Sequence, residues 1–276
     1  MGSTRDANLN VYLDTKRIIS EDVSVQESIK NSIKNQEFIP EGKVVEFSVP
    51  EDKRPCFISV TRNKTMDAAS NYADGKKRIA VLNFASATTP GGGVTKGASA
   101  QEECLCRVST LYDCLTDADM FAKFYQPHRD ELNALHNDDI IYTPDVLVLK
   151  NDDYQPYEDI DRFKVDVITC AAPNLRDYNV DMYNIDKPIE RQVSDEELKA
   201  IHVKRARQIL SVAASKGVDV LILGAFGCGV FRNSPKVVAE AYKEVLQDFR
   251  KAFDTVEFAV YCARDTENYD VFKAIL

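Results

Sequence analysis

Short apolar runs alternate with longer helix-like stretches along most of this chain, and that alternation constrains its fold more than any other feature. Several runs are nearly continuous in apolar residues, as expected for strands that are buried on both faces. The strands that we predict are 44–49, 78–85, 145–150, 165–171, 219–224 and 256–262. The predicted helices are 101–115, 118–136, 195–216, 235–252 and 267–275. We therefore predict an α/β fold, with a sheet that is covered by helices on both sides.

The N-terminal part of the chain lacks the features that suggest a site. Residues 12–37 are polar with scattered apolar positions, which predicts helices on a surface. We interpret residues 1–75 as an accessory segment that packs on a core formed by residues 76–276. Residues 176–193, rich in Asp, Tyr and Asn, are predicted to form a loop insertion near the mouth of the site.

Two glycine-rich segments each follow a predicted strand directly. The segment Pro90–Glu103 contains the successive glycines Gly91, Gly92 and Gly93, and a second segment spans Gly224–Asn233. Glycine lets a backbone approach a ligand closely and adopt positive φ at little steric cost. Ligands of α/β sheets sit beyond the carboxyl ends of strands, so parallel strands would place both segments around one crevice.

Two adjacent carboxylates, Glu102 and Glu103, stand at the start of the helix that follows the triple glycine. Residues Ser99 to Glu102 also fit a capping box, in which Glu102 would bond to the N-cap N–H. Glu103 has no such local role, and its structural alternative is a solvated acid on a helix face. Adjacent helical residues point about 100° apart, so the two carboxylates cannot have the same direction.

The second glycine segment has the composition of an anion-binding turn. Gly227 and Gly229 would let successive N–H groups converge on phosphate oxygens without a lysine. The G-x-x-G-x-G spacing is neither a P-loop nor a dinucleotide-binding fingerprint. A tight turn that packs a helix on a strand is the alternative. Cys228 is predicted to be a small buried residue, because no motif places a histidine beside it.

The GGG-x7-QEE arrangement, with NFAS before it and CLCRVSTLY after it, resembles the signature of bacterial-type poly(ADP-ribose) glycohydrolases. The block GAFGCGVFRN is similar to the diphosphate loop of that family, and IYTPDVLVLK and VDVITCAAPNL also match. The resemblance covers roughly residues 12–276. It implies a macrodomain-like mixed sheet sandwiched between helices, with a mainly helical N-terminal accessory segment.

The resemblance also implies roles for individual residues. Glu103, the second Glu of QEE, would be the general acid and base, and Glu102 would contact a substrate ribose. Phe231 would order the ribose nearest the cut, with a core phenylalanine as the rival interpretation, and Val230 would lie against the same ligand. The remaining predicted substrate-binding residues are Asn83, Gly91, Gly92, Gly93, Gln101, Gly227, Cys228 and Gly229.

Cleavage of a glycosidic bond requires protonation of the leaving oxygen while positive charge develops at the anomeric carbon. A carboxylic acid that keeps its proton at neutral pH needs burial or a nearby negative charge. Glu102 and the diphosphate of a ligand would both supply such charge beside Glu103. A second carboxylate across the site, as in many glycosidases, is not evident in the sequence.

The composition excludes several other classes of protein. The net charge of −9 argues against a general nucleic-acid binder, which needs a basic surface. Seven cysteines without a regular framework favour reduced thiols, and three scattered histidines argue against a zinc site. No apolar run approaches the roughly 18 residues of a membrane span, and the first residues lack the apolar region of a secretory signal. We therefore expect a cytoplasmic monomer that needs no metal or cofactor and contacts no membrane.

The resemblance implies a hydrolase that cleaves ribose–ribose O-glycosidic bonds of poly(ADP-ribose) from chain ends, as the bacterial form does. Its partners would be poly(ADP-ribose) or ADP-ribosylated protein, and ADP-ribose would be the product. An ADP-ribose reader is the alternative from a different class, and the QEE triplet argues against it because a reader needs no positioned acid. A hydrolase of mono-ADP-ribosyl conjugates also stays open.

Overall fold

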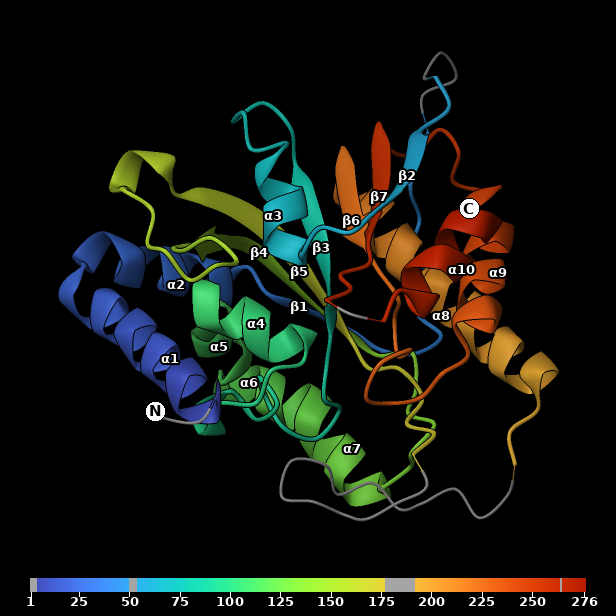
Figure 1. Ribbon diagram of the computed structural model, residues 1–276, viewed down its shortest axis with the longest axis horizontal. Coiled ribbons are helices and arrows are strands. Elements are labelled where there is room, and N and C mark those ends of the chain that lie inside the picture. Colours follow the sequence, from blue (N-terminus) through green and yellow to red (C-terminus); the bar gives the residue numbers. More distant parts are fainter. Residues whose placement is uncertain (1–3, 50–53, 177–191, 264) are drawn as a thin grey trace.

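A seven-stranded mixed sheet forms the centre of the computed structural model, which describes residues 4–49, 54–176, 192–263 and 265–276 (Figure 1). Its strands are β1 (Glu37–Ile39), β2 (Phe57–Thr61), β3 (Ile79–Phe84), β4 (Ile140–Val148), β5 (Phe163–Cys170), β6 (Val220–Leu223) and β7 (Thr255–Ala259). Across the sheet they lie in the order β1-β4-β5-β3-β6-β7-β2. The predicted α/β sheet is confirmed.

The central strand β3 has parallel neighbours on both sides. It pairs with β5 and with β6, and Val81 lies opposite Ile222 in the latter pair. The pairs β6·β7 and β7·β2 are also parallel, whereas β4 is antiparallel to β5 and β1 to β4. Because β3 and β6 run in the same direction, the segments that follow them leave the sheet at the same edge.

Helices cover both faces of the sheet (Figure 1). One face packs against α8 (Asp195–Ser215), α9 (Pro235–Leu246) and α10 (Glu267–Ile275). The other face packs against α3 (Thr65–Ser70), α4 (Gln101–Val108), α5 (Leu111–Leu115) and the segment of α6 (Ala118–Met120) and α7 (Gln126–Glu131). The sheet thus separates two apolar cores, as the alternation of strands and helices predicts.

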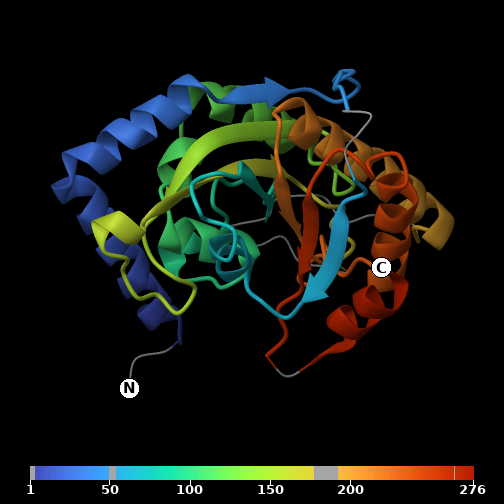
Figure 2. The same ribbon diagram turned by 90° about the horizontal axis from the view of Figure 1, so that it is seen from above.

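The N-terminal segment wraps around the outside of the β4 edge (Figure 2). It consists of α1 (Thr4–Glu21), α2 (Val23–Lys34) and the edge strand β1, and it continues to β2 at the opposite edge. The buried Lys150 holds α1 in place, with Nζ 3.0 Å from the carbonyl oxygen of Val11 and 2.8 Å from Oδ2 of Asp14. The domain boundary near residue 75 stays a prediction, and the residues before it complete both edges of the sheet.

Two strand predictions need correction, and two strands were missed. Residues 44–49 form no strand, because their alternating apolar side chains pack on the core without a neighbouring ladder; the ring of Phe47 stacks on Phe249 at 5.0 Å. Strand β4 begins at Ile140 rather than at residue 145, since a bulge between Thr143 and Val146 accommodates a proline inside the strand. The short edge strands β1 and β2 were not predicted.

Three helix predictions were too long, and one of them, 235–252, ends at Leu246 as α9. The predicted helix 101–115 is divided into α4 and α5, because the Ser109 hydroxyl accepts a hydrogen bond from the N–H of Leu111 at 3.2 Å between them. The predicted helix 118–136 is divided into α6, a π-helical turn at Phe121–Tyr125 and α7, which ends at Leu132 with φ 54°. Most of the predicted insertion 176–193 lies outside the described residues.

Candidate active site

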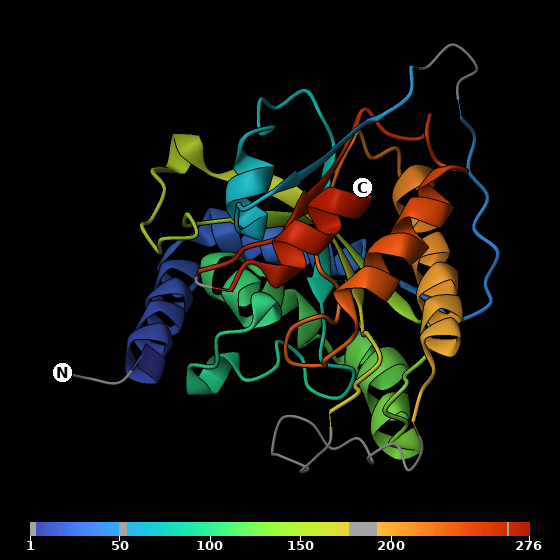
Figure 3. The same cartoon turned by 45° about the vertical axis from the view of Figure 1, so that its right-hand side comes forward.

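The two glycine segments leave the same edge of the sheet, as expected for parallel neighbouring strands (Figure 3). We call residues 85–100, after β3, the first glycine loop, and residues 224–233, after β6, the second glycine loop. The helix α4 begins directly after the first loop, so its first turn carries Glu102 and Glu103 to this edge. The sequence prediction that the two loops share one edge is confirmed.

The glycines of the first loop make room for the two carboxylates. Gly91 and Gly92 have φ values of 65° and 53°, in the left-handed region that favours glycine. A methyl carbon on Gly92 would lie 2.6 Å from Oε1 of Glu103 and 3.3 Å from Oε2 of Glu102. The N–H of Gly93 donates to Oε1 of Glu103 at 2.9 Å. All three glycines are buried, and their observed contacts are with the protein itself.

Glu102 is buried and held by the end of β3 rather than by a capping box. Its Oε2 accepts a hydrogen bond from the N–H of Ser86 at 2.8 Å, and its Oε1 accepts one from Nδ2 of Asn83 at 3.2 Å. The N-cap residue of α4 is Ala100, whose side chain cannot cap. The capping-box interpretation is therefore wrong. A capping box requires the Glu102 carboxyl group at the N-cap N–H, but the backbone N–H of Ser86, beyond β3, binds this group instead.

Burial and the neighbouring carboxylate of Glu103 raise the pKa of Glu102 to about 8. Both effects disfavour the charged form of a carboxyl group. The hydrogen bonds from Ser86, Asn83 and the N–H of Gly91 act in the opposite direction, but they are weaker. Glu102 therefore favours its protonated form at neutral pH.

Glu103 is also buried, with 7% of its surface exposed, so the solvated helix-face alternative is wrong. Its Oε1 is fixed by Gly93, whereas its Oε2 has no hydrogen-bond partner among the described residues. A buried polar atom without a partner is costly and uncommon in native proteins. The arrangement leaves one oriented and buried carboxyl oxygen without a partner among the described residues.

Gln101 and Asn83 act as braces in this structure. Oε1 of Gln101 accepts from the N–H of Phe84 at 2.9 Å, and Nε2 donates to the carbonyl oxygen of Leu82 at 2.8 Å. This side chain therefore ties the start of α4 to the end of β3. Asn83 is fully buried and joins Glu102 to Thr169, so it reaches the site through Glu102. Ligand contact by either residue stays a prediction.

The second glycine loop presents unpaired backbone donors. Within the described residues, no group accepts a hydrogen bond from the N–H of Gly227, Gly229, Val230 or Phe231. Gly227 has φ 77°, and a methyl carbon there would lie 2.7 Å from Cβ of Ala172. Gly229 is exposed, with open space around it. Successive free N–H groups in a turn form a concave surface that binds anions.

The other predicted residues of this loop differ in exposure. Val230 is 57% exposed, whereas the Phe231 ring is half-buried, 6.1 Å from His136 and 5.8 Å from the Arg176 guanidinium. Cys228 is half-buried, its Sγ lies 3.7 Å from the carbonyl oxygen of Phe226, and burial raises the pKa of its thiol. The loop thus offers an apolar side chain and an aromatic ring beside its free donors.

Two residues that sequence reasoning missed support the second loop. The side chain of Asn233 bonds to carbonyl oxygens within the loop and beyond β5, and its Oδ1 lies 2.7 Å from Nε2 of His202 on α8. Asn233 is the last residue of the block GAFGCGVFRN, but its role depends on a helix that begins nearly forty residues earlier in the chain. No spacing in the sequence points to His202, because only the fold brings α8 beside the loop.

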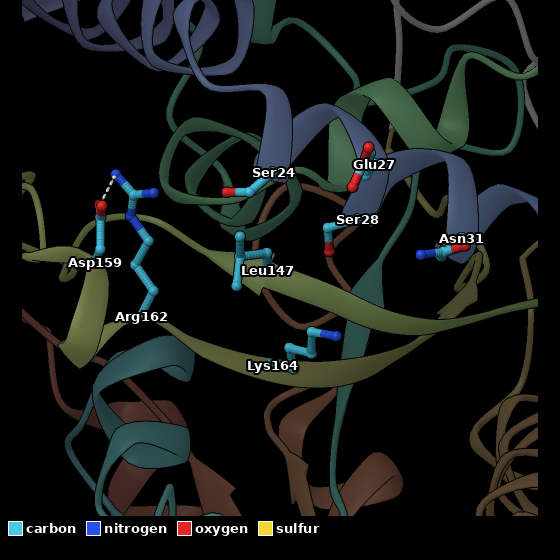
Figure 4. Close-up of a pocket in the computed structure, with 8 residues that line it drawn as sticks. All are labelled: Ser24, Glu27, Ser28, Asn31, Leu147, Asp159, Arg162 and Lys164. Carbon is cyan, nitrogen blue, oxygen red and sulfur yellow. Dashed lines mark ion pairs between the residues drawn. The ribbon is translucent and has the colours of Figure 1, made fainter.

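A surface hollow of about 360 Å³ lies elsewhere, between α2 and strands β4 and β5 (Figure 4). Its lining residues are Ser24, Glu27, Ser28, Asn31, Leu147, Asp159, Arg162 and Lys164. The Arg162 guanidinium is already paired with Asp22 and Asp159, each at 2.8 Å. None of the predicted site residues lines this hollow, so we do not assign the chemistry to it.

Three further findings concern the described part of the chain. No helix there has the length and apolar character needed to cross a bilayer. Nor do three or more His, Cys, Asp or Glu side chains converge there as metal ligands would. The seven cysteines, all of which the structure describes, form no disulfide with one another.

Comparison with known proteins gives consistent matches. The family described as microbial-type PARG, catalytic domain, matches residues 11–151. A crystal structure of poly(ADP-ribose) glycohydrolase (PARG) from Thermomonospora curvata is 29% identical with a TM-score of 0.87, over 98% of this chain and 100% of that one. The same enzyme bound to the inhibitor ADP-HPD gives a TM-score of 0.80 at 29% identity over the same shares of both chains.

A second bacterial structure is also similar. Poly(ADP-ribose) glycohydrolase from Deinococcus radiodurans in complex with ADP-ribose is 32% identical with a TM-score of 0.72, over 90% of this chain and 96% of that one. No relative was found among curated protein sequences. The structural matches extend over the sheet, both glycine loops and most of the N-terminal segment.

Proposed function

The chain belongs to the microbial-type poly(ADP-ribose) glycohydrolase family, and from that premise we propose that it hydrolyses poly(ADP-ribose) and releases ADP-ribose. The bond cleaved is the O-glycosidic bond between two riboses. The observation that carries the proposal is the pair of buried carboxyl groups behind the first glycine loop, in which Oε2 of Glu103 has no partner among the residues that the structure describes.

Glu103 is proposed to be the general acid and then the general base. Its Oε2 would donate a proton to the leaving ribose oxygen as the C–O bond breaks and an oxocarbenium-like ribose forms. Water would then attack the anomeric carbon and return its proton to Glu103, so that the carboxyl group is restored. The raised pKa of Glu102, which adjoins Glu103 in the chain, supports proton transfer at this site.

Glu102 is proposed to contact a ribose of the substrate, in addition to its bonds with Ser86 and Asn83. Asn83 and Gln101 would act as positioning residues, because one holds Glu102 and the other fixes the start of α4. The buried glycines of the first loop would keep the carboxyl groups close to the surface that meets the ligand.

The second glycine loop is proposed to bind the diphosphate. Its free N–H groups at Gly227, Gly229, Val230 and Phe231 match the need of a protein with net charge −9 to bind a polyanion through local donors. The Phe231 ring would lie against the ribose nearest the cut, and Val230 would contact the same ligand.

Several finer points belong to the same proposal. Cleavage from chain ends follows from the resemblance to the bacterial form. Activity as a monomer in the cytoplasm, without a cofactor, is part of the same proposal. ADP-ribosylated protein is proposed as the natural carrier of the polymer.

The decisive experiment follows the release of free ADP-ribose from purified poly(ADP-ribose) over time, with wild type beside Glu103→Gln. Wild type is expected to release ADP-ribose, and the variant to lose about a thousandfold in rate, within the range for removal of a general acid. Full activity of Glu103→Gln would refute its catalytic role. Binding of the polymer by wild type without release would favour the reader alternative, and release only from mono-ADP-ribosylated protein would change the substrate.

A further inference from the structure

The side chain of Asn233 joins two segments at the edge where the ligand is proposed to bind. Its Nδ2 donates to the carbonyl oxygens of Gly227 at 3.1 Å and Phe231 at 3.2 Å, both in the second glycine loop. It also donates to the carbonyl oxygen of Pro173, beyond the end of β5, at 2.6 Å. Asn233 is only 2% exposed, so this bridge is shielded from water.

The segment beyond β5 is a fixed anchor for this bridge. The carbonyl oxygen of Ala171 accepts a hydrogen bond from Nη1 of Arg205 at 2.7 Å. The next carbonyl oxygen, of Ala172, lies 2.8 Å from Nδ1 of His136. With Pro173 bound to Asn233, three successive carbonyl oxygens are held by side chains, so Asn233 ties the glycine loop to an immobilised segment.

The orientation of the Asn233 amide depends on His202. With Nδ2 directed at three carbonyl oxygens, Oδ1 must face an N–H donor, and Nε2 of His202 lies 2.7 Å away. His202 is 1% exposed, and burial lowers its pKa to about 4, so the ring is neutral under physiological conditions. Its proton therefore sits on Nε2. A reversed amide would place an oxygen against three carbonyl oxygens and its own donors against that N–H.

We propose that His202 is a positioning residue for ligand binding: through Asn233 it holds the second glycine loop so that the free N–H groups of Gly229, Val230 and Phe231 converge on a diphosphate. This inference rests on the proposed function, because it assumes that ADP-ribose binds at this loop. His202 does not touch the ligand, and it takes no part in proton transfer at Glu103. Its loss should therefore weaken binding and leave the chemical step nearly unchanged.

The test compares His202→Leu, which removes the donor, with His202→Gln, whose amide nitrogen can take the place of Nε2. Calorimetric titration with ADP-ribose is expected to show about tenfold weaker binding for His202→Leu and at most about threefold for His202→Gln. With poly(ADP-ribose), KM should rise for His202→Leu while kcat changes by less than about threefold.

His128→Leu is the matched control, because His128 is also buried and its Nε2 also lies near the side-chain oxygen of an asparagine, 3.0 Å from Oδ1 of Asn137. That variant is expected to lose stability while its affinity for ADP-ribose stays at the wild-type value. Should His202→Leu not fold, His202→Asn replaces it, since the shorter amide cannot reach Asn233, and the same tenfold weakening is expected.

Wild-type affinity in His202→Leu or its replacement would overturn the inference, as would equal weakening by His128→Leu. Failure of His202→Gln to restore affinity, together with a parallel loss of kcat, would also overturn it, because a general structural role would then suffice. Failure of the proposed function is distinguishable, since in that case wild type itself would not bind ADP-ribose.

Discussion

The two glycine loops use the same residue type in opposite ways. In the first loop the N–H of Gly93 binds Glu103, that of Gly91 binds Glu102 and that of Gly92 binds the carbonyl oxygen of Thr89. In the second loop the N–H groups from Gly229 to Phe231 have no partner within the described residues. In the first loop two of these donors bind the carboxyl groups of Glu102 and Glu103, whereas the donors of the second loop have no partner within the described residues and are proposed to bind a ligand. Glycine content alone does not distinguish a loop whose N–H groups bind side chains of the protein from a loop whose N–H groups are left for a ligand.

Among the variants that test this difference between the loops, Gly92→Ala is expected to have the largest effect. Its φ of 53° disfavours alanine, and the added methyl carbon would lie 2.6 Å from Oε1 of Glu103, so the carboxylate must move. A displacement of about 1 Å at a catalytic group costs about a hundredfold in rate, and we expect that loss in kcat for ADP-ribose release. ADP-ribose affinity, measured by calorimetry, should stay within about threefold of wild type. A large loss of affinity with normal kcat would contradict the division of roles.

A change in the second loop should weaken ligand binding more than it lowers kcat. Gly227→Ala places a methyl carbon 2.7 Å from Cβ of Ala172 and 2.8 Å from Nδ2 of Asn233, at a φ of 77°. The loop must shift, and its donors lose their convergence on the diphosphate. We expect the Kd for ADP-ribose and the KM to rise about tenfold, with a smaller change in kcat. Normal affinity in this variant would argue that the diphosphate binds elsewhere.

The first loop also predicts a pH-dependent stability. The pKa of Glu102 is raised to about 8 when the protein is folded, against about 4.3 in the unfolded chain. Between these values the folded state holds a proton that the unfolded state has lost, so the free energy of unfolding falls as pH rises. Glu102→Gln cannot titrate, and its stability relative to wild type should increase by about 1 kcal/mol per pH unit from pH 5 to pH 8. Urea denaturation at several pH values measures this slope, and a difference independent of pH would count against the raised pKa.

The smallest effect is expected from Gly229→Ala, which serves as a control for Gly227→Ala in the second glycine loop. A methyl carbon there meets no atom within 4 Å, so the unliganded loop keeps its shape. Rate and ADP-ribose affinity should remain within about twofold of wild type if the ligand approaches the N–H groups and not the α-carbon. A tenfold loss of affinity would show that the diphosphate packs directly on this glycine.

Much of the architecture could be predicted from the sequence, because buried parallel strands have a strong apolar signature. Strands β3, β5, β6 and β7 were placed to within a few residues, and the shared edge of the two loops followed from their direction. The edge strands β1 and β2 were missed, since three to five residues with half-exposed faces carry little pattern. Residues 44–49 were mistaken for a strand because apolar alternation reports burial and not hydrogen bonding.

The position of the candidate site could be predicted from the sequence, but the role of each residue in it could not. Glu102 and Glu103 were identified by their place beside the triple glycine. The conformation of the turn decides which backbone donors stay free. The orientation of the Asn233 amide depends on His202, which lies on a helix that begins nearly forty residues earlier. Such contacts are set by packing of distant elements, so local spacing cannot reveal them.

The most direct test of the division between the loops is a crystal structure of the protein in complex with ADP-ribose. We predict diphosphate oxygens within about 3 Å of the N–H groups of Gly229, Val230 and Phe231, and the terminal ribose within hydrogen-bond distance of Oε2 of Glu103. A diphosphate bound away from the second glycine loop, or a Glu103 oxygen that remains without a partner, would contradict the account.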